Sequence, residues 1–123
     1  MHAGARLVGF VPTLDPNAAR SFYGDVLGLP LLSEDGFALL FDCGGGAQLR
    51  VVSAPPFEPQ PFTIAGWKVD DISAEVAALK GRGVAFIRFM ADHDDAGVWT
   101  SPGGSKVAWF RDPDGNLLSL SQG

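Results

Sequence analysis

The densest group of side chains that could do chemistry is the run Asp92-His93-Asp94-Asp95. A carboxylate beside an imidazole can act as a general base, because histidine exchanges protons near neutral pH. The run also fits a solvated loop tip, since exposed loops are commonly polar. Asp92, His93 and Asp94 are therefore candidates for catalysis, but no catalytic residue is assigned from the sequence.

Other short motifs favour structural roles. Gly44-Gly45-Gly46 does not precede a helix, so it indicates a hairpin turn rather than a phosphate-binding loop. Gly103-Gly104-Ser105-Lys106 matches only the end of a Walker A loop and fits a turn that enters a strand. Cys43 is the only cysteine, which excludes an internal disulfide and fits a reducing compartment.

The composition restricts the class of protein. The 123 residues are 46% apolar, which is enough for the core of one domain. The net charge of −5 argues against a nucleic-acid partner, because phosphates are bound by clustered Lys and Arg. No apolar run is long enough to cross a bilayer, and the first residues lack the apolar stretch of a signal peptide. We expect a cytoplasmic protein without membrane or nucleic-acid partners.

The chain contains a repeat of about 56 residues, in which Asp15 matches Asp71. In each copy an apolar run ends at an acidic residue, a stretch of helical periodicity follows, and a glycine ends it. Residues 46–52 can likewise be aligned with residues 115–121. Each copy therefore predicts the order β-α-β-β-β.

The two copies form modules at about residues 1–54 and 62–123, joined by a proline-rich linker at 55–61. Asp15 is expected to cap the first helix and Asp71 the second, at about 72–81. The predicted strands lie at about 6–13, 29–33, 37–42 and 47–53, then at 62–69, 84–89, 105–111 and 116–121. The first two strands of each module flank a helix, so we expect them to run parallel.

Residues 90–104 have no counterpart in the first module. A long insertion in a compact domain is commonly a lid or a binding loop. Trp99 lies in this insertion and is a candidate to close over a ligand, with core packing as the alternative.

Three segments, taken in order within the repeat, resemble the vicinal oxygen chelate superfamily of glyoxalase I, bleomycin resistance proteins and extradiol dioxygenases. They are residues 15–28, Val69-Asp70-Asp71 and residues 109–116. The resemblance covers nearly the whole chain and implies that residues 1–123 form a single domain. It implies an α+β fold in which two βαβββ modules form a cup-shaped half-barrel, the glyoxalase/bleomycin resistance fold. It also implies a homodimer, as is usual for small members.

By the family pattern, metal-dependent members hold a divalent ion in the cup with four side chains. The corresponding residues here are Val8, Arg50, Ile64 and Ser119, and a slip in register adds only Gln48. Val and Ile have no donor atom, arginine stays protonated, and a neutral Ser hydroxyl is a poor sole ligand for zinc. We expect neither a metal nor another cofactor.

The same pattern places Arg50 in an otherwise apolar cup. There it could pair with an anionic group of a ligand or with an internal carboxylate, or it could lie at the dimer interface. The candidate ligand-binding residues are Arg50, Trp99, Val8, Phe10, Gln48, Ile64, Leu117 and Ser119.

These expectations favour a metal-independent member that binds a small, partly hydrophobic molecule in its cup, much as bleomycin resistance proteins sequester a drug. One alternative is a lyase or isomerase of the glyoxalase type that uses the loop at residues 92–95 and Arg50. Another is a structural or regulatory module without catalysis. The sequence does not identify the ligand.

Overall fold

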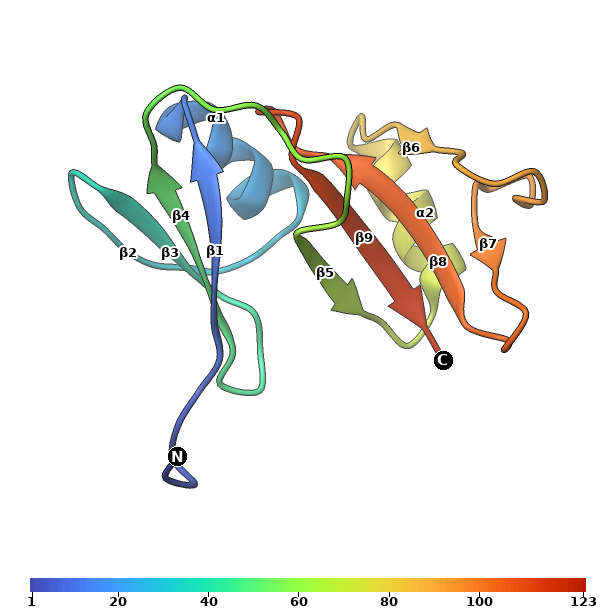
Figure 1. Cartoon of the computed structure of the whole chain (residues 1–123), viewed down its shortest axis with the longest axis horizontal. Helices are drawn as coiled ribbons and strands as arrows, with labels where there is room; N and C mark the ends of the chain where they lie inside the picture. The colour runs from blue at the N-terminus through green and yellow to red at the C-terminus, as the bar shows by residue number, and fades with distance from the viewer. The chain divides into compact units, whose positions relative to one another are not determined.

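The computed structural model describes all residues, 1–123, and the chain divides into two compact units, Met1–Glu58 and Pro59–Gly123 (Figure 1). The boundary between them falls inside the proline-rich linker expected at residues 55–61. Each unit combines one sheet with one helical region, which confirms the expected α+β class. No helix is both long and apolar enough to cross a bilayer.

Unit 1 follows the predicted order of elements. They are β1 (Val8–Thr13), α1 (Pro16–Arg20), the π-helical continuation η1 (Ser21–Val26), β2 (Leu31–Glu34), β3 (Ala38–Asp42) and β4 (Gln48–Ser53). The four-stranded sheet has the order β1-β4-β3-β2, with β1 parallel to β4 and the other neighbours antiparallel.

The strand beside β1 is thus the last strand of the module, although β1 and β2 are the strands that flank the helix. Two short hairpins make β2, β3 and β4 antiparallel neighbours, because adjacent strands joined by tight turns must reverse direction. The free edge next to β4 is then where β1 pairs.

Local chemistry starts and ends the first helical region. The Asp15 carboxylate accepts a hydrogen bond from the Ala18 N–H at 3.2 Å, and Pro16 occupies the first turn, where no N–H is needed. The region ends at Val26 with Leu27 as its C-cap, and Gly28 follows with a φ of 76°, a conformation that glycine adopts without steric cost.

The core of unit 1 lies between this helical region and one face of the sheet. Ala19 and Tyr23, four residues apart, are both fully buried. The Tyr23 ring lies 5.9 Å from the ring of Phe41. The sheet residues buried on this face are Val11, Thr13, Leu39, Phe41, Leu49 and Val51. Since strand side chains alternate, the residues between them point to the opposite face.

Unit 2 repeats this plan with one additional strand. Its elements are β5 (Ala65–Lys68), α2 (Ile72–Gly81), β6 (Phe86–Ile87), β7 (Trp99–Thr100), β8 (Lys106–Arg111) and β9 (Leu117–Gln122). The sheet order is β5-β9-β8-β6, and β7 also pairs with β8. β6 is much shorter than the predicted strand at 84–89, because β6 and β7 pair with different parts of the same edge of β8.

Helix α2 has the predicted bounds and cap. The Asp71 carboxylate accepts a hydrogen bond from the Ala74 N–H at 3.1 Å. Ile72, Val76 and Leu79 are buried at helical spacing, so one stripe of the helix faces the sheet. The sheet residues buried in unit 2 include Ala108, Phe110, Leu118 and Leu120.

The register of the two sheets confirms the internal repeat. In unit 1 Phe10 lies beside Arg50, and in unit 2 Gly66 lies beside Ser119. These are the positions that the sequence alignment of the two copies equates. The repeat is therefore structural as well as sequential.

Candidate ligand-binding surfaces

The sheet of unit 1 has one face without a helix, which we call open face 1. It carries Val8, Phe10, Leu40, Gln48, Arg50 and Val52. Four of the predicted ligand-binding residues, Val8, Phe10, Gln48 and Arg50, therefore lie together on one surface. The other four, Ile64, Trp99, Leu117 and Ser119, belong to unit 2.

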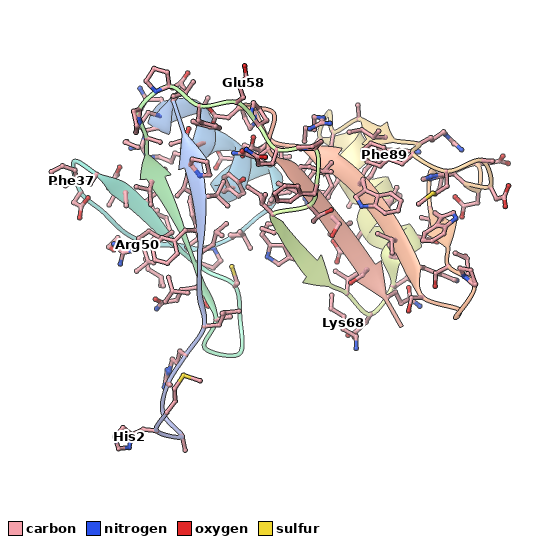
Figure 2. The ribbon with its side chains drawn as sticks, in the orientation of Figure 1. His2, Phe37, Arg50, Glu58, Lys68 and Phe89 are labelled. Carbon is pink, nitrogen blue, oxygen red and sulfur yellow. The ribbon has the colours of Figure 1, made fainter.

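Arg50 occupies the middle of open face 1. Its backbone lies between those of Phe10 on β1 and Leu40 on β3. The side chain is half-buried and forms neither a hydrogen bond nor an ion pair within the chain. Figure 2 shows it on the side of the β2–β3 hairpin, whose tip carries Phe37. The guanidinium thus has all its donors available to a ligand or to water.

The charge of Arg50 acts on the carboxylate of Asp35, in the β2–β3 turn. Hydrogen bonds from the N–H groups of Phe37, at 2.7 Å, and Ala38, at 2.9 Å, lower the pKa of Asp35, and the charge of Arg50 lowers it further. Asp35 is therefore engaged mainly with its own turn and does not form an ion pair with Arg50.

Open face 1 is otherwise mostly apolar. Phe10 exposes 63% of its surface, and Val8, Leu40 and Val52 are half-buried. Among the strand residues on this face, Arg50 is the only cation. An apolar surface with one unpaired guanidinium can hold an apolar molecule and orient a polar group on it.

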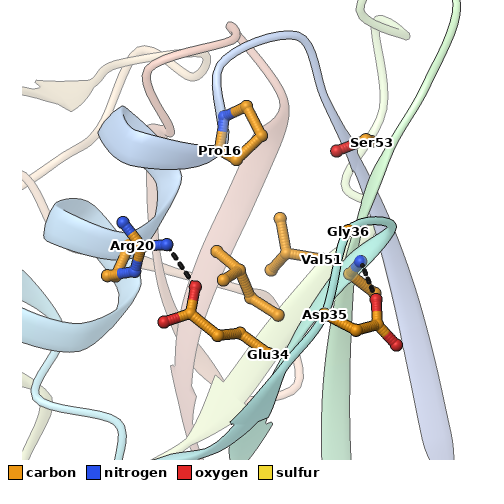
Figure 3. Close-up of a pocket in the computed structure, with 9 residues that line it drawn as sticks. Pro16, Arg20, Glu34, Asp35, Gly36, Val51 and Ser53 are labelled. Atoms are coloured by element: carbon orange, nitrogen blue, oxygen red, sulfur yellow. Dashed lines mark hydrogen bonds and ion pairs between the residues drawn. The ribbon is translucent and has the colours of Figure 1, made fainter.

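A small pocket of about 50 Å³ lies on the other side of the sheet of unit 1, between the helical region and β2 to β4 (Figure 3). Arg20 and Glu34 form an ion pair at its wall, and Arg20 also donates to Asn17 at 2.9 Å. Arg20 Nε is buried without a partner. None of the predicted ligand-binding residues lines this pocket.

The helix-free face of the sheet in unit 2, which we call open face 2, carries Gly66, Trp109, Ser119 and Trp99. A Cβ atom at Gly66 would come within 2.5 Å of Ser119 Oγ, so the serine hydroxyl fills the space that a side chain would need. Leu117 is almost fully buried, and Ile64 donates its N–H to the Leu117 carbonyl at 3.0 Å. The positions that match Phe10 and Arg50 are thus small and neutral here.

Open face 2 carries an aromatic cluster instead, formed by Phe89, His93, Trp99 and Trp109. The Trp109 ring lies 5.5 Å from Phe89, 5.8 Å from His93 and 5.9 Å from Trp99. Trp99 and Trp109 are half-buried, and Phe89 exposes 48% of its surface. Contacts of this kind hold the rings in place while leaving part of each ring accessible.

His93 holds the insertion closed on itself. Its Nε2 accepts a hydrogen bond from the Met90 N–H at 3.1 Å, and its Nδ1 lies 2.7 Å from the Gly97 carbonyl, to which it donates. These roles fit the neutral ring with the proton on Nδ1. Asp94 accepts a hydrogen bond from the Val98 N–H at 2.8 Å. Two of the candidate catalytic residues therefore shape the loop, whereas Asp92 is exposed and forms no hydrogen bond.

Two cations fasten the same segment to its surroundings. Arg88 donates to the carbonyl of His93 at 3.5 Å and of Asp95 at 3.2 Å. Lys80, on α2, donates to the Ala96 carbonyl at 2.6 Å. The insertion, expected as a lid or binding loop, is thus bonded to unit 2 along its length, and β7 places Trp99 in the sheet.

Sequence reasoning did not select Phe89 or Trp109. Trp109 could have been found, because the repeat alignment equates it with Leu40, which is next to Arg50 in unit 1. Phe89 carried no such signal, since it lies in a segment without a counterpart.

The residues at the positions implied for a metal do not fit a divalent ion. Val8 and Arg50 share open face 1, and Ser119 lies on open face 2 beside Gly66, two residues after Ile64. None of these side chains offers an anionic or imidazole donor. Across the chain, no three His, Cys, Asp or Glu side chains are grouped as a metal site would need.

Comparisons with known proteins agree with this fold. The family model described as Glyoxalase/Bleomycin resistance protein/Dioxygenase superfamily matches residues 5–120. No curated protein matches the chain significantly.

Solved structures similar to the chain include an antibiotic binding protein, TnmS3, from Streptomyces sp. CB03234. It is 27% identical with a TM-score of 0.77, over 99% of this chain and 98% of that one. A glyoxalase/bleomycin resistance protein from the same organism is 28% identical with a TM-score of 0.73, over 96% and 100% of the two chains. Lactoylglutathione lyase from Agrobacterium tumefaciens is 20% identical with a TM-score of 0.74, over 99% and 96%, and indicates the fold alone.

Proposed function

Because the chain belongs to the Glyoxalase/Bleomycin resistance protein/Dioxygenase superfamily, we propose that it binds and sequesters a small, partly hydrophobic molecule. The binding surface is open face 1, with Arg50 and Phe10 as the main contacts. The donor chemistry described above gives a metal ion no part in this function.

The observation that carries the proposal is the unpaired Arg50 within an exposed apolar surface. An exposed Phe10 costs solubility, and the guanidinium of Arg50 forms no hydrogen bond or ion pair that would stabilise the fold. Both features are useful if a ligand covers them. The similarity to an antibiotic binding protein at 27% identity supports the same class of function.

Open face 2 provides a second apolar surface for the same activity. Trp99 and Trp109 offer large flat areas at low conformational cost, and their segment is already bonded in place. Ile64 and Ser119 would contribute shape rather than charge, whereas Leu117 is too deeply buried to contact a ligand. We propose ligand contacts here for Trp99 and for Ser119, whose hydroxyl can donate a hydrogen bond.

A lyase or isomerase that uses residues 92–95 with Arg50 has no specific observation in its favour. The side chains of His93 and Asp94 form hydrogen bonds with backbone groups of the loop. Binding without turnover is therefore the function that the geometry supports best.

A thermal-shift screen against hydrophobic antibiotics and other apolar drugs tests the proposal. A ligand at about one hundred times its Kd stabilises the folded state by about 2.7 kcal/mol and raises the melting temperature by several degrees. Phe10→Ala should weaken the best hit, because it removes exposed surface from open face 1. Phe62→Ala is the matched control, since Phe62 exposes 58% of its surface in unit 2. The proposal fails if no compound stabilises the chain, or if Phe10→Ala binds the best hit as tightly as the parent.

We also infer that the protein forms a homodimer. Within unit 1 the sheet ends at β2, where Leu31 and Leu32 expose 40% and 50% of their surfaces. Exposed apolar edge strands pair readily, and two-fold association is the commonest form of assembly. Sedimentation at micromolar concentration should give twice the chain mass of 12.9 kDa. A monomer at that concentration would contradict the inference.

A further inference from the structure

We infer that Arg50 makes open face 1 selective for anions, and specifically for a carboxylate carried by a flat apolar body. This inference rests on the proposed function, since it names the class of molecule that the surface would hold. It goes beyond that function because an apolar surface alone does not distinguish between acids, amides and amines.

The first observation is the free state of the guanidinium. Arg50 is half-buried between Phe10 and Leu40, and no group of the chain accepts any of its hydrogen bonds. A guanidinium presents parallel N–H groups that match the two oxygens of a carboxylate. Partial burial among apolar neighbours reduces screening by water, so the pair would be stronger than one on an open surface.

The second observation is that two carboxylates of the same sheet, Asp35 and Asp42, leave Arg50 unpaired. Asp35 lies close enough for the two charges to interact, and its carboxylate is held ionised by its own turn. Asp42 lies one row away on the same face, where it accepts a hydrogen bond from the Gly44 N–H at 2.8 Å. Both carboxylates are engaged with backbone N–H groups and neither forms an ion pair with Arg50, which leaves the guanidinium to an anionic group of a ligand.

The third observation is the apolar surface on both sides of the guanidinium. Phe10 lies beside Arg50 on one strand, with 63% of its surface exposed, and Leu40 lies on the other. A ligand whose carboxylate reaches Arg50 can lay an aromatic body across these residues. The acid group then sets orientation, and the apolar contacts supply area.

Unit 2 provides the contrast within the same chain. Ser119 stands at the position of Arg50. Two cations share that face: Arg111 donates to the Gly115 carbonyl at 2.8 Å, whereas Lys68 is exposed and forms no hydrogen bond. A fully hydrated ammonium discriminates little between ligands. Lys68→Gln is therefore a control that removes one positive charge without touching open face 1.

Three probes with one scaffold test the inference: 2-naphthoate, 2-naphthamide and 2-naphthylmethylammonium, each titrated by calorimetry at neutral pH. The acid should bind at least about tenfold more tightly than the amide, which is the effect of one charged hydrogen-bonded pair, and the amine should bind most weakly. Arg50→Gln should lower the affinity for 2-naphthoate by about tenfold while leaving that for 2-naphthamide unchanged. Lys68→Gln should change neither affinity by more than about twofold.

The outcomes separate this inference from the proposed function. Equal affinities for acid and amide in the parent, or an unchanged preference in Arg50→Gln, would overturn the selectivity and leave binding of apolar molecules in place. If no probe binds at millimolar concentration, the selectivity is overturned, and the screen of apolar drugs then decides the proposed function. Circular dichroism and the melting temperature establish that Arg50→Gln folds, as its lack of partners leads us to expect.

Discussion

Open face 1 and open face 2 occupy equivalent places in a repeated fold, yet they offer different chemistry. Where unit 1 has Phe10 beside Arg50, unit 2 has Gly66 beside Ser119. In the next strand Leu40 of unit 1 corresponds to Trp109 of unit 2. One face is apolar around a single half-buried cation, Arg50. The other carries aromatic rings held by a bonded loop, and its cations Lys68 and Arg111 are exposed.

The helix-covered faces of the two sheets are much more alike. Phe41 and Phe110 occupy equivalent positions, and both are fully buried. Leu49 and Leu118 are likewise equivalent and buried. Packing against a helix restricts a position to apolar residues of suitable volume, whereas a helix-free face is not restricted in this way. The difference between the open faces is therefore where function should be sought.

The largest expected effect tests the likeness of the two cores. Phe41→Ala and Phe110→Ala should each lower the free energy of unfolding by about 3–5 kcal/mol, because each leaves a cavity in a closed core. Urea unfolding measures both. If one variant loses much less than the other, the two cores are not energetically equivalent.

A smaller effect is expected from filling the space at Gly66. In Gly66→Ala the new Cβ would approach Ser119 Oγ to 2.5 Å, so we expect a loss of about 1–3 kcal/mol in the free energy of unfolding. Gly9→Ala is the matched control in unit 1, since its Cβ would meet only the Leu49 side chain at an ordinary 3.5 Å. Equal stability of the two variants would mean that Ser119 can move aside at no cost.

The bonded loop of unit 2 predicts an effect of similar or lesser size for His93. His93→Ala removes the bonds to Met90 and Gly97, which should cost about 1–3 kcal/mol and loosen Trp99 and Trp109. Tryptophan fluorescence should shift to longer wavelength as the rings gain contact with water. Asp92→Ala is the control, because Asp92 is exposed and forms no hydrogen bond. An unchanged emission spectrum in His93→Ala would show that the loop holds without the imidazole.

The smallest expected effect is the pH dependence carried by Asp35. Hydrogen bonds from Phe37 and Ala38 lower its pKa below the ordinary 3.8, so ionised Asp35 stabilises the folded state. A lowered pKa contributes stability that is present above the unfolded value and is lost as the pH falls through the folded one. Asp35→Asn should therefore melt slightly below the parent at pH 7, and the difference should shrink below about pH 4. If the difference in melting temperature stays constant from pH 7 to pH 3, the effect of the substitution comes from turn geometry rather than from the charge of Asp35.

Much of the fold could be predicted from the sequence because its signals are local. The caps Asp15 and Asp71, the helix at 72–81 and the alternating strands follow from spacing over a few residues. Val8, Phe10, Gln48 and Arg50 share one face of the sheet, because side chains alternate along each strand and β1 pairs with β4 in this register. The alternation within each strand needed no knowledge of distant contacts.

The tertiary structure decided what those residues touch. The two hairpins leave free edges at β2 and at β4, and the fold pairs β1 with the edge at β4. His93, a candidate general base, instead connects two parts of its own loop, because the backbone brings Met90 and Gly97 to its two ring nitrogens. Arg50 was a candidate for an internal ion pair until the fold left every carboxylate beyond bonding distance. Periodicity orients a side chain, but its partners are chosen by segments far away in the sequence, and only their packing shows whether a charge is left free.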